Sequence, residues 1–252
     1  MKLHFIHTLH LLTVTLIYGK SPLKVATDHS GNTSDISTDE LVLHFDDGSS
    51  EKLTNNGCME RVPVLSHNGS HIVFLRRFDS NVDGLTDWDD EVELWLMTLG
   101  SRAESRIAPQ LTNPSQATWH PKKMIFAFIA DEKGKGRGLY IHDLDKGTTN
   151  RLADEADSWP TWSSGGGFIA FYDEDNKVVI FDPAKGVRKD LSEDVGNGWA
   201  LYWTEDNRLV FTVEGAGWQI YSPGAKNPKL LSAKAHKKLT FVDQEKFGWS
   251  TK

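Results

Sequence analysis

Residues 159–171 read Trp-Pro-Thr-Trp-Ser-Ser-Gly-Gly-Gly-Phe-Ile-Ala-Phe: an aromatic residue and a serine, a short polar turn, and an apolar triplet that ends in phenylalanine. The same phrase recurs at Leu65-Ser66 with 72–74, at Trp119-His120 with 126–128 and at Trp203-Thr204 with 209–211. Each copy continues with a second apolar run and then a leucine before a small residue. Copies spaced by roughly 40 to 45 residues, with four short strands each, are typical of a β-propeller.

The apolar segments are short, rich in aromatic and β-branched residues, and bounded by Gly, Asn, Asp or Pro. This composition predicts antiparallel strands joined by tight turns, and no helical periodicity of similar strength follows the N-terminus. We therefore expect Trp119, Trp162 and Trp203 to pack between neighbouring blades rather than to hold a ligand.

The two ends of the repeat region resemble two halves of one blade. Residues 41–54 match the third and fourth strands of a blade, and residues 239–250 match the first and second. Pairing the two halves leaves no exposed edge strand, which is the usual hazard of an open sheet. The sequence thus predicts an all-β chain in which residues 40–252 form a five-bladed propeller with a composite closing blade.

The stretch from Trp159 through Phe171, followed by residues 178–182 and 188–192, resembles the repeat of the TolB-like propellers. Such repeats also form the non-catalytic propellers of prolyl-oligopeptidase-type enzymes. The resemblance covers about residues 40 to 252 and implies the architecture. It implies no specific activity, because one fold hosts many functions.

The N-terminus resembles an export signal. Residues 1–19 contain one lysine, an apolar core at 11–17 and a small residue at Gly19, which predicts a secretory signal peptide and an exported protein. An uncleaved anchor and a chance apolar N-terminus are the alternatives. Residues 20–39 are rich in Ser, Thr, Asp and Gly, which predicts a flexible tether. Cys58 is the only cysteine, so no intramolecular disulfide can form.

The chain carries 28 Lys and Arg against 35 Asp and Glu, a formal net charge of −7. Nucleic-acid binding requires a basic surface that neutralises phosphates, and no basic stripe is present. We therefore expect no nucleic-acid partner, and no membrane span beyond the N-terminal signal.

The first full blade is longer than the others, and the surplus lies between its second and third strands as Asp79 to Asp90. Oxygen side chains stand at positions 1, 3, 5 and 9 of this stretch, glycine at position 6 and a carboxylate at position 12, the spacing of a calcium loop. The alternative is a polar excursion that uses Asn and Asp-Gly turn chemistry. The predicted calcium ligands are Asp79, Asn81, Asp83, the Leu85 carbonyl, Asp87 and Asp90.

Propeller topology puts this loop on the same face as the connections between blades. Those connections are acidic, at 131–132, 154–157, 173–175 and 193–194. An acidic rim attracts basic protein segments or cations, so we expect a protein or peptide partner, with a basic one favoured. An ordinary solvated surface is the alternative.

Catalytic motifs are absent from the sequence. It contains no Gly-x-Ser-x-Gly elbow, no His-Glu-x-x-His and no phosphate-binding glycine loop, and Gly165-Gly166-Gly167 is explained by a hairpin turn. The favoured prediction is a monomeric, non-enzymatic binding or scaffold propeller with no catalytic residues. The alternative is a lyase or hydrolase that acts on sugars or peptides in the central funnel.

Overall fold

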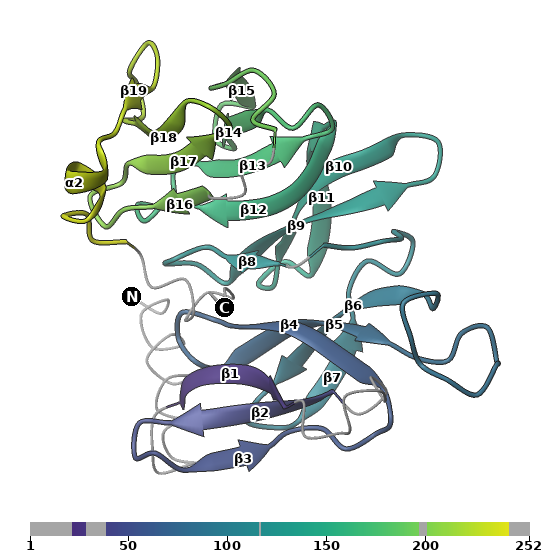
Figure 1. The fold of residues 1–252 in the computed structure, drawn as a ribbon. Coiled ribbons are helices and arrows are strands. Elements are labelled where there is room, and N and C mark those ends of the chain that lie inside the picture. Colours follow the sequence, from purple (N-terminus) through teal and green to yellow (C-terminus); the bar gives the residue numbers. More distant parts are fainter. Residues whose placement is uncertain (1–21, 29–38, 116, 197–200, 242–252) are drawn as a thin grey trace, which may run out of the picture. The chain divides into compact units, whose positions relative to one another are not determined.

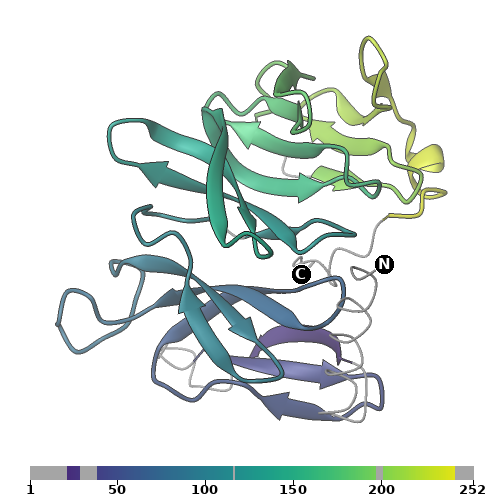
Figure 2. The ribbon, with the colours of Figure 1, turned by 180° about the vertical axis from the view of Figure 1, so that it is seen from behind.

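The structure is a computed structural model that describes residues 22–28, 39–115, 117–196 and 201–241. The described residues divide into two compact units, with the boundary between residues 117 and 118. The described residues form antiparallel strands in five sheets and one short helix, α2 (Ala233–His236) (Figures 1 and 2). The predicted all-β class is confirmed, and the five sheets are consistent with five blades.

The first unit holds two sheets whose strands are ordered as in the sequence. The first sheet contains β1 (Pro22–Asp28), β2 (Glu40–Phe45) and β3 (Ser50–Lys52). The second contains β4 (Met59–Leu65), β5 (His71–Arg77), β6 (Val92–Thr98) and β7 (Ala103–Arg106). The buried residues Leu41 and Leu43 of β2 form one core cluster with Ile72 and Phe74 of β5.

The second unit holds three four-stranded sheets, each again a run of consecutive strands. The first contains β8 (Thr118–Trp119), β9 (Ile125–Glu132), β10 (Gly136–Asp143) and β11 (Thr148–Asp154). The second contains β12 (Ala156–Trp162), β13 (Ile169–Asp173), β14 (Val178–Asp182) and β15 (Val187–Asp190). The third contains β16 (Leu201–Trp203), β17 (Leu209–Val213), β18 (Gly217–Tyr221) and β19 (Lys229–Leu230).

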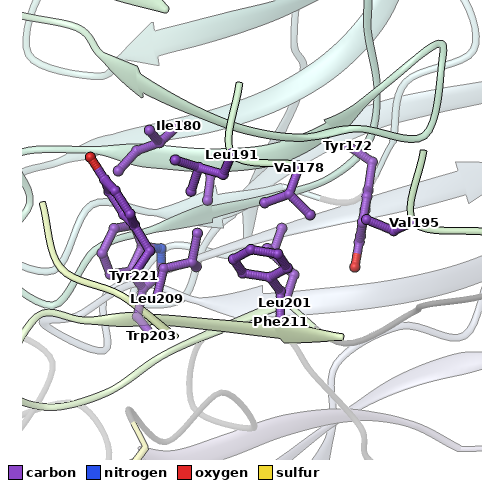
Figure 3. Packing of buried hydrophobic residues seen from close by; sticks show 11 residues of the cluster. Tyr172, Val178, Ile180, Leu191, Val195, Leu201, Trp203, Leu209, Phe211 and Tyr221 are labelled. Carbon is purple, nitrogen blue, oxygen red and sulfur yellow. The ribbon is translucent and has the colours of Figure 1, made fainter. Parts of the chain in front are cut away.

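The apolar core lies between neighbouring sheets. Figure 3 shows Val178 and Ile180 of β14 facing Leu209 and Phe211 of β17, with Trp203 beside them. The Trp203 side chain is fully buried, and its Nε1 donates a hydrogen bond of 3.2 Å to the Thr161 carbonyl oxygen on β12. Trp119 and Trp162 are also buried, so the prediction that the repeated tryptophans are core residues is confirmed.

The polar residue after each repeated Trp or Leu closes the hairpin that follows. The Ser163 hydroxyl oxygen accepts the Phe168 N–H at 3.1 Å, and the Thr204 hydroxyl oxygen accepts the Arg208 N–H at 2.9 Å. In the blade that has histidine, Nδ1 of His120 accepts the N–H groups of Lys122 and Lys123 at 3.0 and 3.1 Å. Any side chain that can accept from a turn N–H satisfies the position, which explains why the motif varies among Ser, Thr and His.

The strands β4 and β12 each contain a bulge at a proline. The register shifts between Arg61 and Val64 in β4 and between Ser158 and Thr161 in β12. The residues that precede the prolines, Val62 and Trp159, have positive φ values of 49° and 60°. Proline lacks the N–H that a strand needs, so it occurs inside a strand mainly at a bulge.

The fully buried Glu60 of β4 anchors the connection between β3 and β4. Its carboxylate accepts hydrogen bonds from Thr54 and Asn56 and pairs with the buried Arg76 of β5 at 2.9 Å. Desolvation by this burial raises the pKa of Glu60 above its usual range, although the three partners act in the opposite direction. The pair lies in the core of the first unit, so removing one partner leaves a buried charge.

The N-terminal part of the repeat region differs from the prediction. Residues 22–28, predicted as part of a flexible tether, form β1, which pairs with β2 from Pro22↔Phe45 to Asp28↔Glu40. β2 has an open edge that a strand can satisfy, and Val25 of β1 is buried in the same cluster as Leu41. The predicted signal peptide at 1–19 lies outside the described residues.

The expected pairing of residues 239–250 with residues 41–54 is not seen at β2, whose two partners are β1 and β3. Phe241 instead forms an isolated antiparallel bridge with Thr204, and the Glu205 N–H donates to the Thr240 carbonyl oxygen at 3.0 Å. The remainder of the expected strands, residues 242–250, lies outside the described residues. Within the described part of the chain, no helix has the length and apolar character that a membrane crossing requires.

Candidate functional site

The connection between β5 and β6, residues 78–91, is the long excursion expected in the first full blade, and it extends from its sheet (Figure 1). Its first turn is organised by Asp79. The two carboxylate oxygens of Asp79 accept the N–H groups of Asp83 at 3.0 Å and Gly84 at 2.9 Å. Gly84 has a φ of +90°, a conformation that glycine adopts without a steric penalty.

The next polar side chains continue this pattern one turn further. The Asn81 side-chain oxygen accepts the Asp83 N–H at 3.0 Å, and Asp83 accepts the Leu85 N–H at 2.9 Å. Asp87 in turn accepts the Asp89 N–H at 2.9 Å. These are Asx turns, in which a short side chain replaces a backbone acceptor.

Asp90 holds the two ends of the loop together. One of its carboxylate oxygens accepts the Ser80 N–H at 2.7 Å and the Ser80 hydroxyl at 2.9 Å, and the other accepts the Asp87 N–H at 3.0 Å. The side chain is buried, and these hydrogen bonds, that from the Asp87 N–H first, lower the pKa of Asp90. Asp90 therefore acts as the internal anchor of the loop.

The predicted calcium ligands thus lie in one loop but do not converge on one point. Asp79, Asn81 and Asp83 share the first turn, and their oxygens, like those of Asp90, accept backbone N–H groups. Among the described residues, which include the whole loop, no three His, Cys, Asp or Glu side chains are placed to hold a metal ion. Calcium binding by this loop stays a prediction.

The apolar residues of the loop were not singled out by the sequence reasoning. Val82, Leu85 and Trp88 are 84%, 63% and 59% exposed. The Trp88 ring lies against two guanidinium groups, with Arg61 and Arg77 at 4.9 and 5.1 Å from its centroid. A spacing of three between apolar residues, with carboxylates between them, was the sequence signal available.

The acidic loops of the second unit are largely paired with basic residues of the same unit. Arg137 contacts Asp131 and Asp157, and Arg188 pairs with Asp173 and lies 3.5 Å from Glu155. Two further pairs are Arg151 with Asp154 and Lys177 with Asp175, at 2.7 and 2.9 Å. These pairs reduce the field of the predicted acidic rim, and its sharing of a face with the β5–β6 loop stays a prediction.

Three of the histidines make structural contacts in the described part of the chain. His120 is buried and accepts turn N–H groups, and His142 is buried beside Phe126 and hydrogen-bonded to Thr149 at 2.9 Å. His236 belongs to α2 and stacks on Trp218, with ring centroids 4.0 Å apart. Each of these three side chains has a structural contact within its own sheet or the segment beside it.

Comparison with known proteins places the fold. No family model matches the sequence, and no curated protein matches it. Among solved structures, a TolB candidate from Agrobacterium tumefaciens is 14% identical with a TM-score of 0.55, covering 82% of this chain and 80% of that one. An oligogalacturonate lyase in complex with manganese is 11% identical with a TM-score of 0.56, covering 77% of this chain and 61% of the lyase.

A third neighbour is a prolyl endopeptidase, 15% identical with a TM-score of 0.55. The match covers 93% of this chain and 38% of the endopeptidase, so this chain spans well under half of that protein. Identities this low show the fold alone. The described chain has the fold of a TolB-like β-propeller.

Proposed function

We propose that the chain is an exported, non-enzymatic propeller that binds a protein or peptide partner, and that its β5–β6 loop binds calcium. The observation that carries the proposal is the order of this loop. Asp79, Asn81, Asp83 and Asp90 fix its backbone through hydrogen bonds, although the loop adds only Thr86 and Asp90 to the buried residues. An ordered loop on a rigid scaffold is a common site of binding residues.

The first turn gathers three of the predicted calcium ligands. Asp79, Asn81 and Asp83 supply oxygens at alternate positions of a tight turn, as a hard cation requires. Asp90, like the residues of the first turn, accepts backbone N–H groups, so a bound ion that recruits Asp90 must share or replace those bonds. Calcium would then change the backbone around Ser80 and Asp87 as well as bind to the loop.

Calorimetry and thermal unfolding test the calcium part. A ligand bound only by the native state stabilises it by about 2.7 kcal/mol at a hundredfold excess over Kd. We expect millimolar calcium to raise the melting temperature of the wild type. The melting temperature of the Asp83→Ala variant should not change when calcium is added. Asp89→Ala removes the same charge from an exposed loop position outside the predicted ligand set, and it should keep the rise. Heat of binding that is absent in the wild type, or equal in Asp83→Ala, would refute calcium binding.

An enzyme that acts on sugars or peptides is the alternative, and the lyase and endopeptidase neighbours share the fold of this chain. Incubation with oligogalacturonate plus manganese, and separately with a proline-containing peptide, separates the two classes. We expect no turnover of either compound. Turnover by purified protein that is lost on heat denaturation would establish the alternative.

A further inference from the structure

The β5–β6 loop reverses the usual distribution of polar and apolar residues. Its two buried residues, Thr86 and Asp90, are polar, with exposed fractions of 6% and 4%. Its three large apolar residues face solvent, and they make up three of the five exposed large hydrophobic residues in the described part of the chain. Single exposed apolar residues are ordinary, whereas three within seven positions of one loop indicate a contact surface.

The backbone at Val82 and the Trp88 ring are also held in place before any partner binds. Val82 has a φ of +61°, which is unfavourable for a β-branched residue. The neighbouring hydrogen bonds from the Asp83 N–H to Asp79 and Asn81 fix the chain there. Arg77 contacts the Trp88 ring and donates to the Trp88 carbonyl oxygen at 3.2 Å, and a further bond links it to the Asp90 carbonyl oxygen. Such preorganisation lowers the entropy lost on binding.

The charge around these residues defines the partner. Residues 79–91 contain six carboxylates and no Lys, Arg or His, and these carboxylates outnumber the two guanidinium groups of Arg61 and Arg77 at the Trp88 ring. Asp83, Asp89 and Glu91 are exposed beside Val82, Leu85 and Trp88. Charge complementarity across an interface suppresses wrong partners and speeds association. A surface that fits the loop therefore combines an apolar pocket with a basic rim.

We propose that Val82, Leu85 and Trp88, here named the apolar tip, dock into an apolar site flanked by lysine or arginine on a protein or peptide partner. The inference rests on the proposed binding function and does not require calcium. Trp88 is the central anchor, because its large ring is fixed by Arg61 and Arg77 yet remains 59% exposed.

A displayed library of random peptides, selected on the full chain, tests the inference. We expect enriched peptides that combine aromatic or aliphatic residues with Lys or Arg. Synthetic versions of these peptides should bind the Trp88→Ser variant about tenfold or more weakly than the wild type, which is the loss typical of an anchor residue. They should also associate more slowly at high salt, because the Debye length falls from about 10 Å at 0.1 M to about 3 Å at 1 M. Leu230→Ser, at a leucine of β19 that is 73% exposed, is the control and should leave affinity unchanged.

The outcomes separate this inference from the proposed function. Peptides that bind wild type and the variant V82S/L85S/W88S equally would overturn the apolar tip and leave a binding propeller. An absence of enriched peptides, or enrichment of acidic peptides, would also overturn it. Sedimentation that shows concentration-dependent dimers of wild type but not of the variant would assign the tip to a second copy of this chain and refute the basic partner. Equal peptide affinity with and without chelator would show that binding by the apolar tip does not depend on calcium.

Discussion

The turn between β12 and β13 and the loop between β5 and β6 both connect neighbouring strands and both bury a polar side chain, but they differ in the exposure of the apolar residues beside it. In the turn, the hydroxyl of Ser163 serves the Phe168 N–H while the surrounding Trp162 and Ile169 fill the core. In the loop, the Asp90 carboxylate accepts hydrogen bonds from backbone N–H groups, and Trp88 faces solvent. In both regions a polar side chain accepts backbone N–H groups. In the β12–β13 turn this stabilises a connection next to the core, and in the β5–β6 loop it holds apolar residues toward solvent. The β12–β13 turn therefore serves the fold, and the β5–β6 loop is the connection that we propose to contact a partner.

Replacing a tryptophan in each region should give the largest contrast. Trp203→Ala removes a fully buried ring of the core, and we expect it to lower the free energy of unfolding by about 3–5 kcal/mol. Trp88→Ala removes a ring that is 59% exposed, and we expect a change within about 0.5 kcal/mol. Urea unfolding followed by circular dichroism measures both. A Trp88→Ala cost near that of Trp203→Ala would make the loop part of the core.

Glycine substitutions should give a smaller contrast. Both Gly166 in the β12–β13 turn and Gly84 in the loop have positive φ, so alanine costs about 1–2 kcal/mol at either position. At Gly166 the added Cβ would also lie 2.5 Å from the His120 ring, which adds an overpacking cost of about 1–3 kcal/mol. At Gly84 no atom lies within 4 Å of the added Cβ. The same unfolding measurement should rank Gly166→Ala as the more destabilising, and equal costs would contradict the packing at His120.

Glu60 and Asp90, two of the buried carboxylates, should have pKa values shifted in opposite directions. Burial raises the pKa of Glu60, so its contribution to stability is complete below the unfolded value and declines as the pH rises through the folded value. Hydrogen bonds lower the pKa of Asp90, so its contribution is complete above the unfolded value and is lost as the pH falls through the folded value. Carbon-detected NMR titration of the side-chain carboxyls measures both directly.

We expect Asp90 to titrate below the ordinary aspartate value of about 3.9 and Glu60 above the ordinary glutamate value of about 4.3. Asp90→Asn should speed hydrogen exchange at the amides of Ser80 and Asp87 while the core strands stay protected, because the anchor serves the loop alone. Uniformly faster exchange across β5 and β6 would show that Asp90 supports the whole blade.

Several parts of the fold follow from the sequence because they depend on local pattern. The recurrence of Trp or Leu, a polar acceptor and an apolar triplet predicted the full blades, since each strand alternates between buried faces and each acceptor closes a hairpin. The position of the long loop between the second and third strands of the first full blade was also predicted. So was the burial of Trp119, Trp162 and Trp203.

Other parts were decided only by tertiary structure. β1 lies in a segment of weak strand character, and it forms because β2 offers an open edge and a buried site for Val25. A carboxylate adds little to an acidic rim when a guanidinium group pairs with it. The sequence does not show this pairing, because Arg137 and Arg188 are distant in sequence from most of the acids they pair with. The direction of each loop side chain depends on which backbone N–H groups the anchor Asp90 reaches. The sequence by itself therefore determined the repeat, its strands and the place of the loop, because these depend on local periodicity. Tertiary contacts decided that the loop buries Asp90 and exposes Trp88, because only folding brings Ser80, Arg61 and Arg77 to them.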